Sequence, residues 1–373
     1  GLLYFYPPGD IGGSEIIVST LDGPIIGMKS VSNMVVYGLT LEATRHNGIT
    51  IDGCKNSLVA GCTIRNTGNL GIIVEGGLNI GIAGCDIYDT GEGGIQINGG
   101  SWPDILPSGH FVENNHIYRY NRFSHGGGKF AVFGSGVGIR ISHNLVSDAP
   151  YAGIMFEGNN NVVEYNEIYD IMYEGKDGGA IYTYGAPRSL MNRGNIIRHN
   201  FIHHITEHTS VVPYDNPGVV AIYIDALNAG LTIVGNVIYR CTGTSIFTHG
   251  ADSRVDDNIF ADNRLSIHQG NRSYLLREPH RIKFWKDSFL DMISYRQPPW
   301  VSRYPQMRDI LRKEEHKNLG WPKNVSIQRN INVAGQFIRI TNDLYEGNVI
   351  KDNLDGIDPF FADDEGLDFS LRP

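Results

Sequence analysis

Two short phrases of alternating apolar and polar residues recur along the chain. Copies of the first phrase read AGCTIRNT, AGCDIYDT, EYNEIYDI and VGNVIYRC, and successive copies lie 22 to 36 residues apart. The third position of this phrase, which we call the anchor, is mostly Asn or a small residue. The nine anchors are Leu39, Cys62, Cys85, Asn115, Asn144, Asn166, Asn200, Asn236 and Asn258.

The second phrase follows the first and reads GITIDG, GIIVEG, GIQING, GIMFEG, AIYTYG, AIYIDA or SIFTHG. In five copies its first apolar residue lies ten positions after the anchor, namely Ile49, Ile72, Ile95, Ile154 and Ile246. Alternation with period two is typical of a strand with one buried face. The residues predicted to point inward include Ile49 and Ile51, Ile72 and Val74, Ile154 and Phe156, Ile181 and Thr183, and Ile222 and Ile224.

A period near 22 residues, with several short strands per turn, is typical of a parallel β-helix, because each coil buries its apolar face by stacking on its neighbours. We therefore predict an all-β, right-handed parallel β-helix that forms one domain over residues 1–373. The Asn anchors predict a stacked ladder of side-chain amides at one corner, with Cys62 and Cys85 in the same column. Residues 271–323 break the repeat with charges at helical spacing, which predicts a helical or loop insertion, and coils resume at SIQRNINV and YEGNVIKDN.

Composition narrows the classes of protein that fit this repeat. The 373 residues carry a net charge of −9 without basic runs, which argues against nucleic acid as a partner. No stretch of about eighteen consecutive apolar residues occurs, so we expect no membrane span. The four Cys form no CxxC pair and predict neither a disulfide framework nor a zinc site. The opening GLLYFYPPGD lacks the regions of a signal peptide, so we expect a removed signal or missing upstream sequence.

The outward positions of the second phrase form a column of carboxylates, aromatic rings and one His. Stacked strands lie about 4.8 Å apart, so this column predicts a surface stripe with rings for sugar stacking and oxygens for sugar hydroxyls. For each residue alone, the alternative is a solvated sheet face whose aromatics reflect β-propensity. We predict that substrate is bound by Glu75, Tyr182, Tyr184, Tyr223, Phe247 and His249, with Arg188 from the following turn.

Two turns before the second phrase are lengthened. The spacing from anchor to second phrase rises from ten to 15 between Asn166 and Ile181, and to 22 between Asn200 and Ile222. Long loops on a rigid scaffold commonly serve binding or catalysis. These turns therefore point to the strands of AIYTYG and AIYIDA as the place where chemistry occurs.

Two carboxylates accompany these strands. Asp177 precedes AIYTYG and Asp225 ends AIYID, on adjacent predicted coils. Cleavage of a glycosidic bond needs one carboxyl group as acid and a second as base or nucleophile, and the predicted spacing is compatible with both retaining and inverting geometry. We predict Asp177 and Asp225 as the catalytic pair, with Glu157 as a reserve candidate.

Other polar clusters point to chemistry less directly. RHNFIHHITEH contains four His residues without an HExxH motif, and we predict no metal site there. We also predict no cofactor. The alternative is calcium held by Asp256, Asp257 and Asp262, although these residues lack the spacing of an EF-hand.

The run HNLVSDAPYAGIMFEGNNNVVEYNEIYDI, with DGGAIYTYG, AIYID, GNVIYRC and IFTHGADSRVDDNIFADN, resembles the bacterial right-handed parallel β-helix proteins of the pectin-lyase fold. It is most similar to glycoside hydrolase family 141, whose members act on fucosylated pectin or xylan. LLYFYPP, PPWVSRYPQMRDIL and DPFFADDEGLDFSL extend the resemblance over nearly the whole chain. The resemblance implies a pair of acidic catalysts, which match Asp177 in KDGGAIY and Asp225 in AIYID. The sequence departs from the group at Glu157 in MFEG, where a small residue is expected.

Three functions fit this reading. The leading hypothesis is a glycoside hydrolase that cleaves a cell-wall polysaccharide or its side chains, such as xylan or fucosylated pectin. A polysaccharide lyase on the same scaffold would instead remove a proton from a uronate, using Lys176, Tyr182, Tyr184, Arg188 or His249. The third is a non-catalytic carbohydrate-binding β-helix. All three take a polysaccharide or oligosaccharide as partner, and a polymer too large to enter a cell predicts an extracellular or periplasmic protein.

Overall fold

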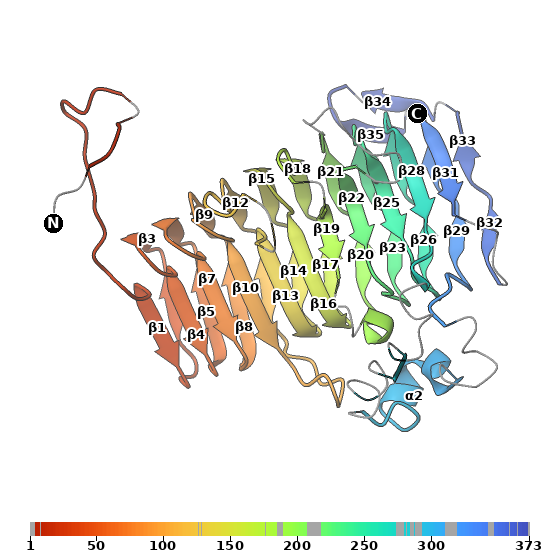
Figure 1. The fold of residues 1–373 in the computed structure, drawn as a ribbon, viewed down its shortest axis with the longest axis horizontal. Coiled ribbons are helices and arrows are strands. Elements are labelled where there is room, and N and C mark those ends of the chain that lie inside the picture. The colour runs from red at the N-terminus through yellow and green to blue at the C-terminus, as the bar shows by residue number, and fades with distance from the viewer. Residues whose placement is uncertain are drawn as a thin grey trace.

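The structure is a computed structural model. It describes residues 4–7, 9–125, 127, 129–175, 177–184, 189–206, 218–273, 280, 282–283, 287, 293–309, 319–341, 347–357, 359–363 and 365–371. Three parallel sheets of eleven strands each wrap around one core, and the coils follow one another along the long axis (Figure 1).

Each sheet takes every third strand of the chain. Sheet A contains β1 (Ile26–Lys29), β4 (Ile49–Asp52), β7 (Ile72–Glu75), β10 (Ile95–Gly99), β13 (Val132–Val137), β16 (Ile154–Asn159), β19 (Gly179–Thr183), β22 (Val220–Ile224), β25 (Thr244–Thr248), β28 (Leu265–Gln269) and β31 (Gln336–Ile340). Sheet B contains β2 (Val35–Tyr37), β5 (Lys55–Ala60), β8 (Leu78–Ala83), β11 (Phe111–Glu113), β14 (Arg140–Ser142), β17 (Val162–Glu164), β20 (Ile196–Arg198), β23 (Thr232–Val234), β26 (Arg254–Asp256), β29 (Ser326–Gln328) and β32 (Val349–Lys351). Sheet C contains β3 (Thr40–Thr44), β6 (Thr63–Thr67), β9 (Asp86–Tyr88), β12 (His116–Tyr118), β15 (Leu145–Ala149), β18 (Glu167–Ile171), β21 (Phe201–His203), β24 (Val237–Tyr239), β27 (Ile259–Ala261), β30 (Ile331–Asn332) and β33 (Leu354–Asp355).

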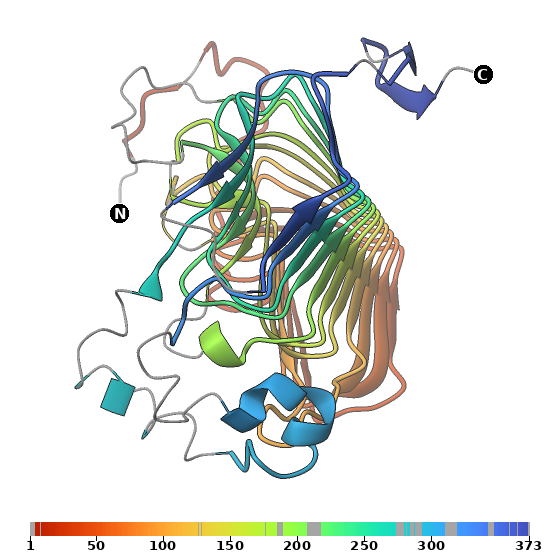
Figure 2. The same cartoon turned by 90° about the vertical axis from the view of Figure 1, so that its right-hand side faces the viewer.

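One strand from each sheet, taken in the order A, B, C, makes one coil, and we number the coils 1 to 11 from β1 onward. The turns within a coil are the A–B turn and the B–C turn, and the C–A turn leads into the next coil. All pairs between coils are parallel and in register, as Ile49 with Ile72 and Ile181 with Ile222 illustrate. This arrangement confirms the predicted right-handed parallel β-helix, and seen along its axis the strands superpose in layers (Figure 2).

The core contains the residues that alternation predicted to point inward. Ile49, Ile72, Ile154, Ile181 and Ile222 each have 0% of their surface exposed. Because each coil covers the apolar face of the one before it, the cores of the coils form one continuous hydrophobic cluster. All four cysteines are buried and free, which agrees with the absence of a disulfide framework in the sequence. Among the described residues, no helix has the length and apolar content to cross a membrane.

The B–C turn is held by the predicted amide ladder. Each Asn donates from Nδ2 to Oδ1 of the next at 2.9 to 3.0 Å, through Asn115, Asn144, Asn166, Asn200, Asn236, Asn258, Asn330 and Asn353. The residue before the anchor is left-handed in all eleven coils, with φ between 53° and 68°. This conformation is costly for most side chains, so the ladder bonds offset it where the residue is not Gly. The ladder is therefore a structural device that sets the corner of every coil it spans.

The break in the repeat lies in the A–B turn of coil 10, between β28 and β29. Its described part includes α2 (Trp300–Arg303) and the 3-10 helix η4 (Pro305–Asp309), and α2 lies outside the stacked sheets (Figure 2). Trp300 is fully buried, donates from Nε1 to the Pro103 carbonyl at 2.7 Å and contacts Trp102 edge to face. Leu190, in the 3-10 helix η1 (Ser189–Met191), and Leu227 join the same cluster. The insertion thus packs on A–B turns of coils 4, 7 and 8.

Two strands lie outside the three sheets. β34 (Phe361–Asp363) and β35 (Asp368–Leu371) form an antiparallel pair. Phe361 packs with Tyr239 of coil 8 and Ala261 of coil 9, so this hairpin covers part of the outer face of sheet C.

Removal of one ladder amide tests its contribution to stability. Asn166 accepts bonds from the Asn144 backbone N–H and amide, and donates to Asn200 and to the Ile141 carbonyl. We expect Asn166→Ala to lower the free energy of unfolding by about 2 to 4 kcal/mol, because several buried groups lose their partners. Urea denaturation measures this change. Gln96→Ala, on the outer side of sheet A, is the control and should change stability by no more than about 0.5 kcal/mol. An equal effect of both substitutions would contradict a structural role for the ladder.

Candidate active site on the outer face of sheet A

Aromatic rings from successive coils stack on the outer face of sheet A. The centroids of Tyr182 and Tyr223 are 5.2 Å apart, and those of Tyr223 and Phe247 are 5.3 Å apart. Phe130, from the C–A turn before β13, approaches Tyr182 at 6.4 Å. Tyr223 and His249 are each only 2% exposed, so this part of the predicted surface stripe is covered rather than open. The rings shield one another, and turns outside the repeat add to the cover.

Asp225 follows directly after β22 and is held in place by several bonds. Its Oδ2 accepts from the Tyr182 hydroxyl at 3.2 Å, and its Oδ1 accepts from the Ala226 N–H at 2.6 Å. Asn228 Nδ2 donates to the main-chain carbonyls of Asp225 and Tyr184, both at 2.7 Å. These bonds fix the carboxylate at the A–B end of β22, with 11% of its side chain exposed.

Asp177 approaches the same face from the opposite end of the neighbouring strand. It lies in the C–A turn before β19 and is exposed. The Tyr151 hydroxyl donates to its main-chain carbonyl. The following Gly179 has no room for a side chain, because a Cβ there would lie 3.1 Å from Cβ of Tyr223. The sequence DGG therefore lets the turn pass close over the aromatic stack before the strand begins.

Electrostatics link the two carboxylates. Partial burial and the charge of Asp225 raise the pKa of Asp177 above its usual value, and the charge of Arg272 partly opposes this shift. Burial, followed by the charges of Asp225 and Asp177, raises the pKa of Tyr182 well above its usual range. The charges of both acids therefore act on the Tyr182 hydroxyl, which also donates to Asp225. Burial and the charge of Asp177 also raise the pKa of Tyr151 to about 12.

Arg272 completes the cluster and was not predicted from the sequence. Its Nη2 donates to the Tyr223 hydroxyl at 3.1 Å and lies 3.7 Å from Oδ1 of Asp225. His249, one coil beyond Asp225, is kept neutral because burial and the charge of Arg272 hold its pKa well below the usual value. Arg272 begins the insertion and Phe130 and Tyr151 lie in C–A turns, where the repeat gives no constant spacing. The spacing of the repeat therefore does not identify these three residues. The sequence shows only that one is basic and two are aromatic.

The remaining predicted residues lie apart from this cluster or outside the described residues. Glu157 accepts from Ser135 Oγ at 2.8 Å and belongs to β16, two coils before β22. Glu75 accepts from the Asn98 amide at 2.9 Å and lies four coils before β19. Tyr184 is 42% exposed beside the cluster. Arg188 and Lys176 fall outside the described residues.

The clusters considered for metals have other partners. Asp256 lies within 4.0 Å of Arg254 and Arg329, Asp257 pairs with Arg329, and Asp262 pairs with Arg240. Within the described part of the chain, no three His, Cys, Asp or Glu residues are grouped to hold a metal ion. No residue in this structure is therefore assigned to calcium.

The fold and this face define the protein as a right-handed β-helical solenoid with an acidic and aromatic cluster on one sheet. A family model described as "Right handed beta helix region" matches residues 14–121 and 104–274, so the chain belongs to this β-helix family. No curated protein matches the sequence.

Two solved structures are similar in part. The surface adhesin PfbA of Streptococcus pneumoniae shares 15% identity over 60% of this chain and 58% of its own, with a TM-score of 0.47. A structure titled "Glycoside hydrolase" shares 18% identity over 60% of this chain and 38% of its own, with a TM-score of 0.36. The matches thus span less than two thirds of either structure, and at these TM-scores neither bears on function.

The raised pKa of Asp177 predicts a pH-dependent effect on stability. Above its folded-state pKa the carboxylate is charged in both states, and the folded state bears the cost of burial and repulsion. Below its usual pKa of 3.8 it is protonated in both states. We therefore expect Asp177→Asn to raise the unfolding temperature at pH 7, with a gain that shrinks as the pH is lowered toward 4. Thermal unfolding followed by circular dichroism measures the gain.

Asp257→Asn is the matched control with the opposite sign. Its hydrogen bond to Arg329 lowers the pKa of Asp257, so its stabilising contribution is present above pH 3.8 and lost as the pH falls through the folded-state pKa. This substitution should lower the unfolding temperature at pH 7. A gain from Asp177→Asn that did not change with pH would show that Asp177 bears no electrostatic cost.

Proposed function

We propose that the protein is a glycoside hydrolase in which Asp177 and Asp225 act on one sugar linkage across the aromatic stack. The observation that carries the proposal is the placement of the two acids around Tyr182: Asp225 accepts from the Tyr182 hydroxyl at 3.2 Å, and Asp177 lies in the turn that leads into the strand of Tyr182. Glycosidases use paired carboxyl groups in different protonation states. A raised pKa on one member of such a pair is what this chemistry needs.

The environments of the two acids favour different roles. Asp177 is exposed and its raised pKa favours the protonated form, so it is suited to give a proton to the leaving oxygen as the bond from the anomeric carbon breaks. Asp225 accepts from the Tyr182 hydroxyl and the Ala226 N–H and lies 3.7 Å from Arg272, so these donors hold its carboxyl group in one orientation. It would therefore serve as the base that takes a proton from water, or as the nucleophile. Glu157 remains the reserve candidate for either role.

The raised pKa values of Tyr182 and Tyr223 argue against the lyase alternative. A lyase base must lose its proton near neutral pH, but burial and the charge of Asp225 raise the pKa of Tyr182 and of Tyr223 far above that range. His249 is neutral but only 2% exposed, which limits its access to a polymer. Tyr182 and His249 therefore fit a lyase reaction less well than the two carboxylates fit hydrolysis.

The finer assignment follows from the resemblance of the sequence. We place the protein with glycoside hydrolase family 141, and the substrate is a cell-wall polysaccharide such as xylan or fucosylated pectin. Tyr184, at 42% exposure, offers an open ring beside Tyr182 of the aromatic stack. The same proposal places the protein outside the cytoplasm, because such polymers do not enter cells.

Hydrolysis is tested with purified protein on xylan, pectin and alginate. Release of reducing ends without absorbance of unsaturated uronate is expected. Asp177→Asn and Asp225→Asn should each lower the rate at least about 10²-fold, because each removes a proton-transfer group or nucleophile. Both variants should keep the circular dichroism spectrum of the parent protein.

Glu113→Gln is the control, since this carboxylate lies on sheet B of coil 4, away from the outer face of sheet A, and its rate should stay within about twofold of the parent rate. Full activity of either Asp variant would remove that residue from the mechanism. Absorbance of unsaturated uronate would identify a lyase instead, and no product from any polymer would leave a binding protein.

A further inference from the structure

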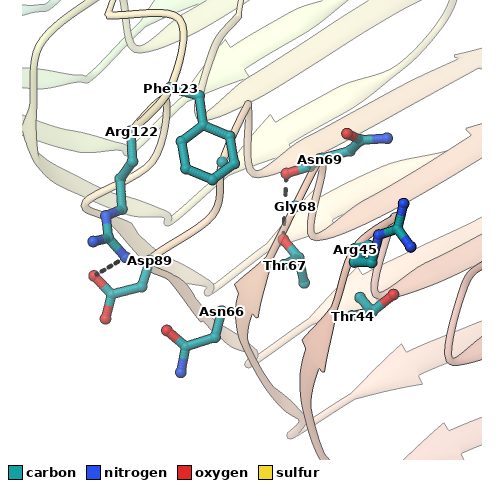
Figure 3. Close-up of a pocket in the computed structure, with 10 residues that line it drawn as sticks. Thr44, Arg45, Asn66, Thr67, Gly68, Asn69, Asp89, Arg122 and Phe123 are labelled. Carbon is teal, nitrogen blue, oxygen red and sulfur yellow. Dashed lines mark hydrogen bonds and ion pairs between the residues drawn. The ribbon is translucent and has the colours of Figure 1, made fainter. Parts of the chain in front are cut away.

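A cavity of about 640 Å³ opens along the C–A turns of the first coils. Its volume is in the range of small-ligand sites. Figure 3 shows Arg122 and Phe123 on one side of this cavity and Arg45 on the other, with Gly68 and Asn69 between them. None of these residues belongs to the acidic cluster on sheet A. The cavity is therefore a second feature that requires an explanation.

Glycines and main-chain bonds build the floor of this cavity. The Gly68 N–H donates to the Thr44 carbonyl at 2.9 Å, and the Gly91 N–H donates to the Thr67 carbonyl at 2.8 Å. A Cβ on Gly91 would lie 2.1 Å from the Gly68 carbonyl oxygen, so only glycine permits this stacking. The floor is thus formed by main chain that adjacent coils hold in place.

Phe123 provides an aromatic ring at one end of the cavity. Its N–H donates to the Gly91 carbonyl at 2.9 Å, which ties the residue to the floor. The side chain is nevertheless 72% exposed. An anchored but open aromatic ring offers an apolar surface on which the C–H face of a sugar ring can pack.

Two weakly paired arginines lie at opposite sides of the cavity. Arg122 Nη1 lies 3.8 Å from an Asp89 oxygen, but Asp89 already accepts from Arg119 at 2.9 and 3.0 Å. Arg45 is 3.9 Å from Asp22, and the side chains of Arg45 and Arg122 are more than half exposed. Both guanidinium groups therefore keep donors for an anion, and a planar carboxylate is a ligand that this fork binds well.

The loop that carries Phe123 also reaches the candidate active site. His125 Nδ1 lies 2.7 Å from Glu174 Oε2, in the C–A turn that holds Asp177. Further along the same loop, Phe130 contacts Tyr182. The turns of Phe123 and Asp177 are two coils apart, about 10 Å at the spacing of stacked strands. One edge of the solenoid thus connects the cavity with the acids.

We infer that this cavity is a distal binding site for a carboxylate-bearing sugar unit of the polysaccharide, with Phe123 packing on the ring and Arg122 and Arg45 binding the carboxylate. The inference rests on the proposed function, because it assigns the second site to the same substrate. It deepens that function in one respect. The preferred substrate is an acidic chain long enough to contact both sites, rather than a short neutral oligosaccharide.

Binding without turnover tests the inference separately from catalysis. In an Asp177→Asn background, affinity for polygalacturonate and for its carboxyl-reduced, neutral form is measured by affinity electrophoresis. We expect tighter binding of the acidic polymer. Phe123→Ala and Arg122→Ala should each weaken its binding at least about tenfold. Arg122→Ala should leave binding of the neutral polymer unchanged.

Tyr37→Ala and Arg308→Ala are matched controls, since each removes an exposed ring or arginine elsewhere on the surface. Circular dichroism verifies that every variant is folded. Equal affinity of the cavity variants and these controls would overturn the inference, and so would equal binding of the two polymers or no binding of the acidic one. Failure of the parent protein to hydrolyse any polymer, with the expected binding losses intact, would reject the proposed hydrolase and keep the site.

Discussion

The register between neighbouring coils is the constraint on which the other features of this protein depend. Parallel main-chain pairing holds each strand directly over the last, and the amide ladder repeats one corner through most of the coils. Because the coils cannot slide, residues separated by 48 positions, such as Asp177 and Asp225, lie on adjacent coils. The same register stacks Tyr182 on Tyr223, with ring centroids 5.2 Å apart.

Much of the fold could be predicted because a strand pattern that is weak in one coil becomes informative when it recurs in many coils. A single GIIVEG predicts only a short strand, but a constant spacing of ten residues behind the anchor predicts a coil, and the anchors fall at the observed corners. The prediction of Asp177 and Asp225 as neighbours used the same register.

The exposure of the outer face could not be predicted in this way. Alternation predicts which face of the sheet a side chain lies on, but not whether that side chain is exposed to solvent. The rings of Tyr223 and Phe247 lie on the outer face and are nevertheless buried. The residues that cover this face and place a positive charge on it come from the C–A turns and the insertion. Phe130 and Arg272 are examples, and both lie at irregular distances from any anchor. Their places depend on three-dimensional packing, so no rule based on spacing would have found them.

The insertion that carries Trp300 also changes how the molecule can come apart. A solenoid held only by nearest neighbours can fray from its ends, one repeat at a time. Here the Trp300 indole donates a hydrogen bond to the Pro103 carbonyl. Trp300 belongs to the A–B turn of coil 10 and Pro103 to that of coil 4, and these two coils are about 29 Å apart along the axis at the spacing of stacked strands. This contact links coil 4 to coil 10, so the repeats between them unfold together. Asp177 and Asp225, on coils 7 and 8, lie between these two coils. Local unfolding there would require the contact between Trp300 and Pro103 to break first.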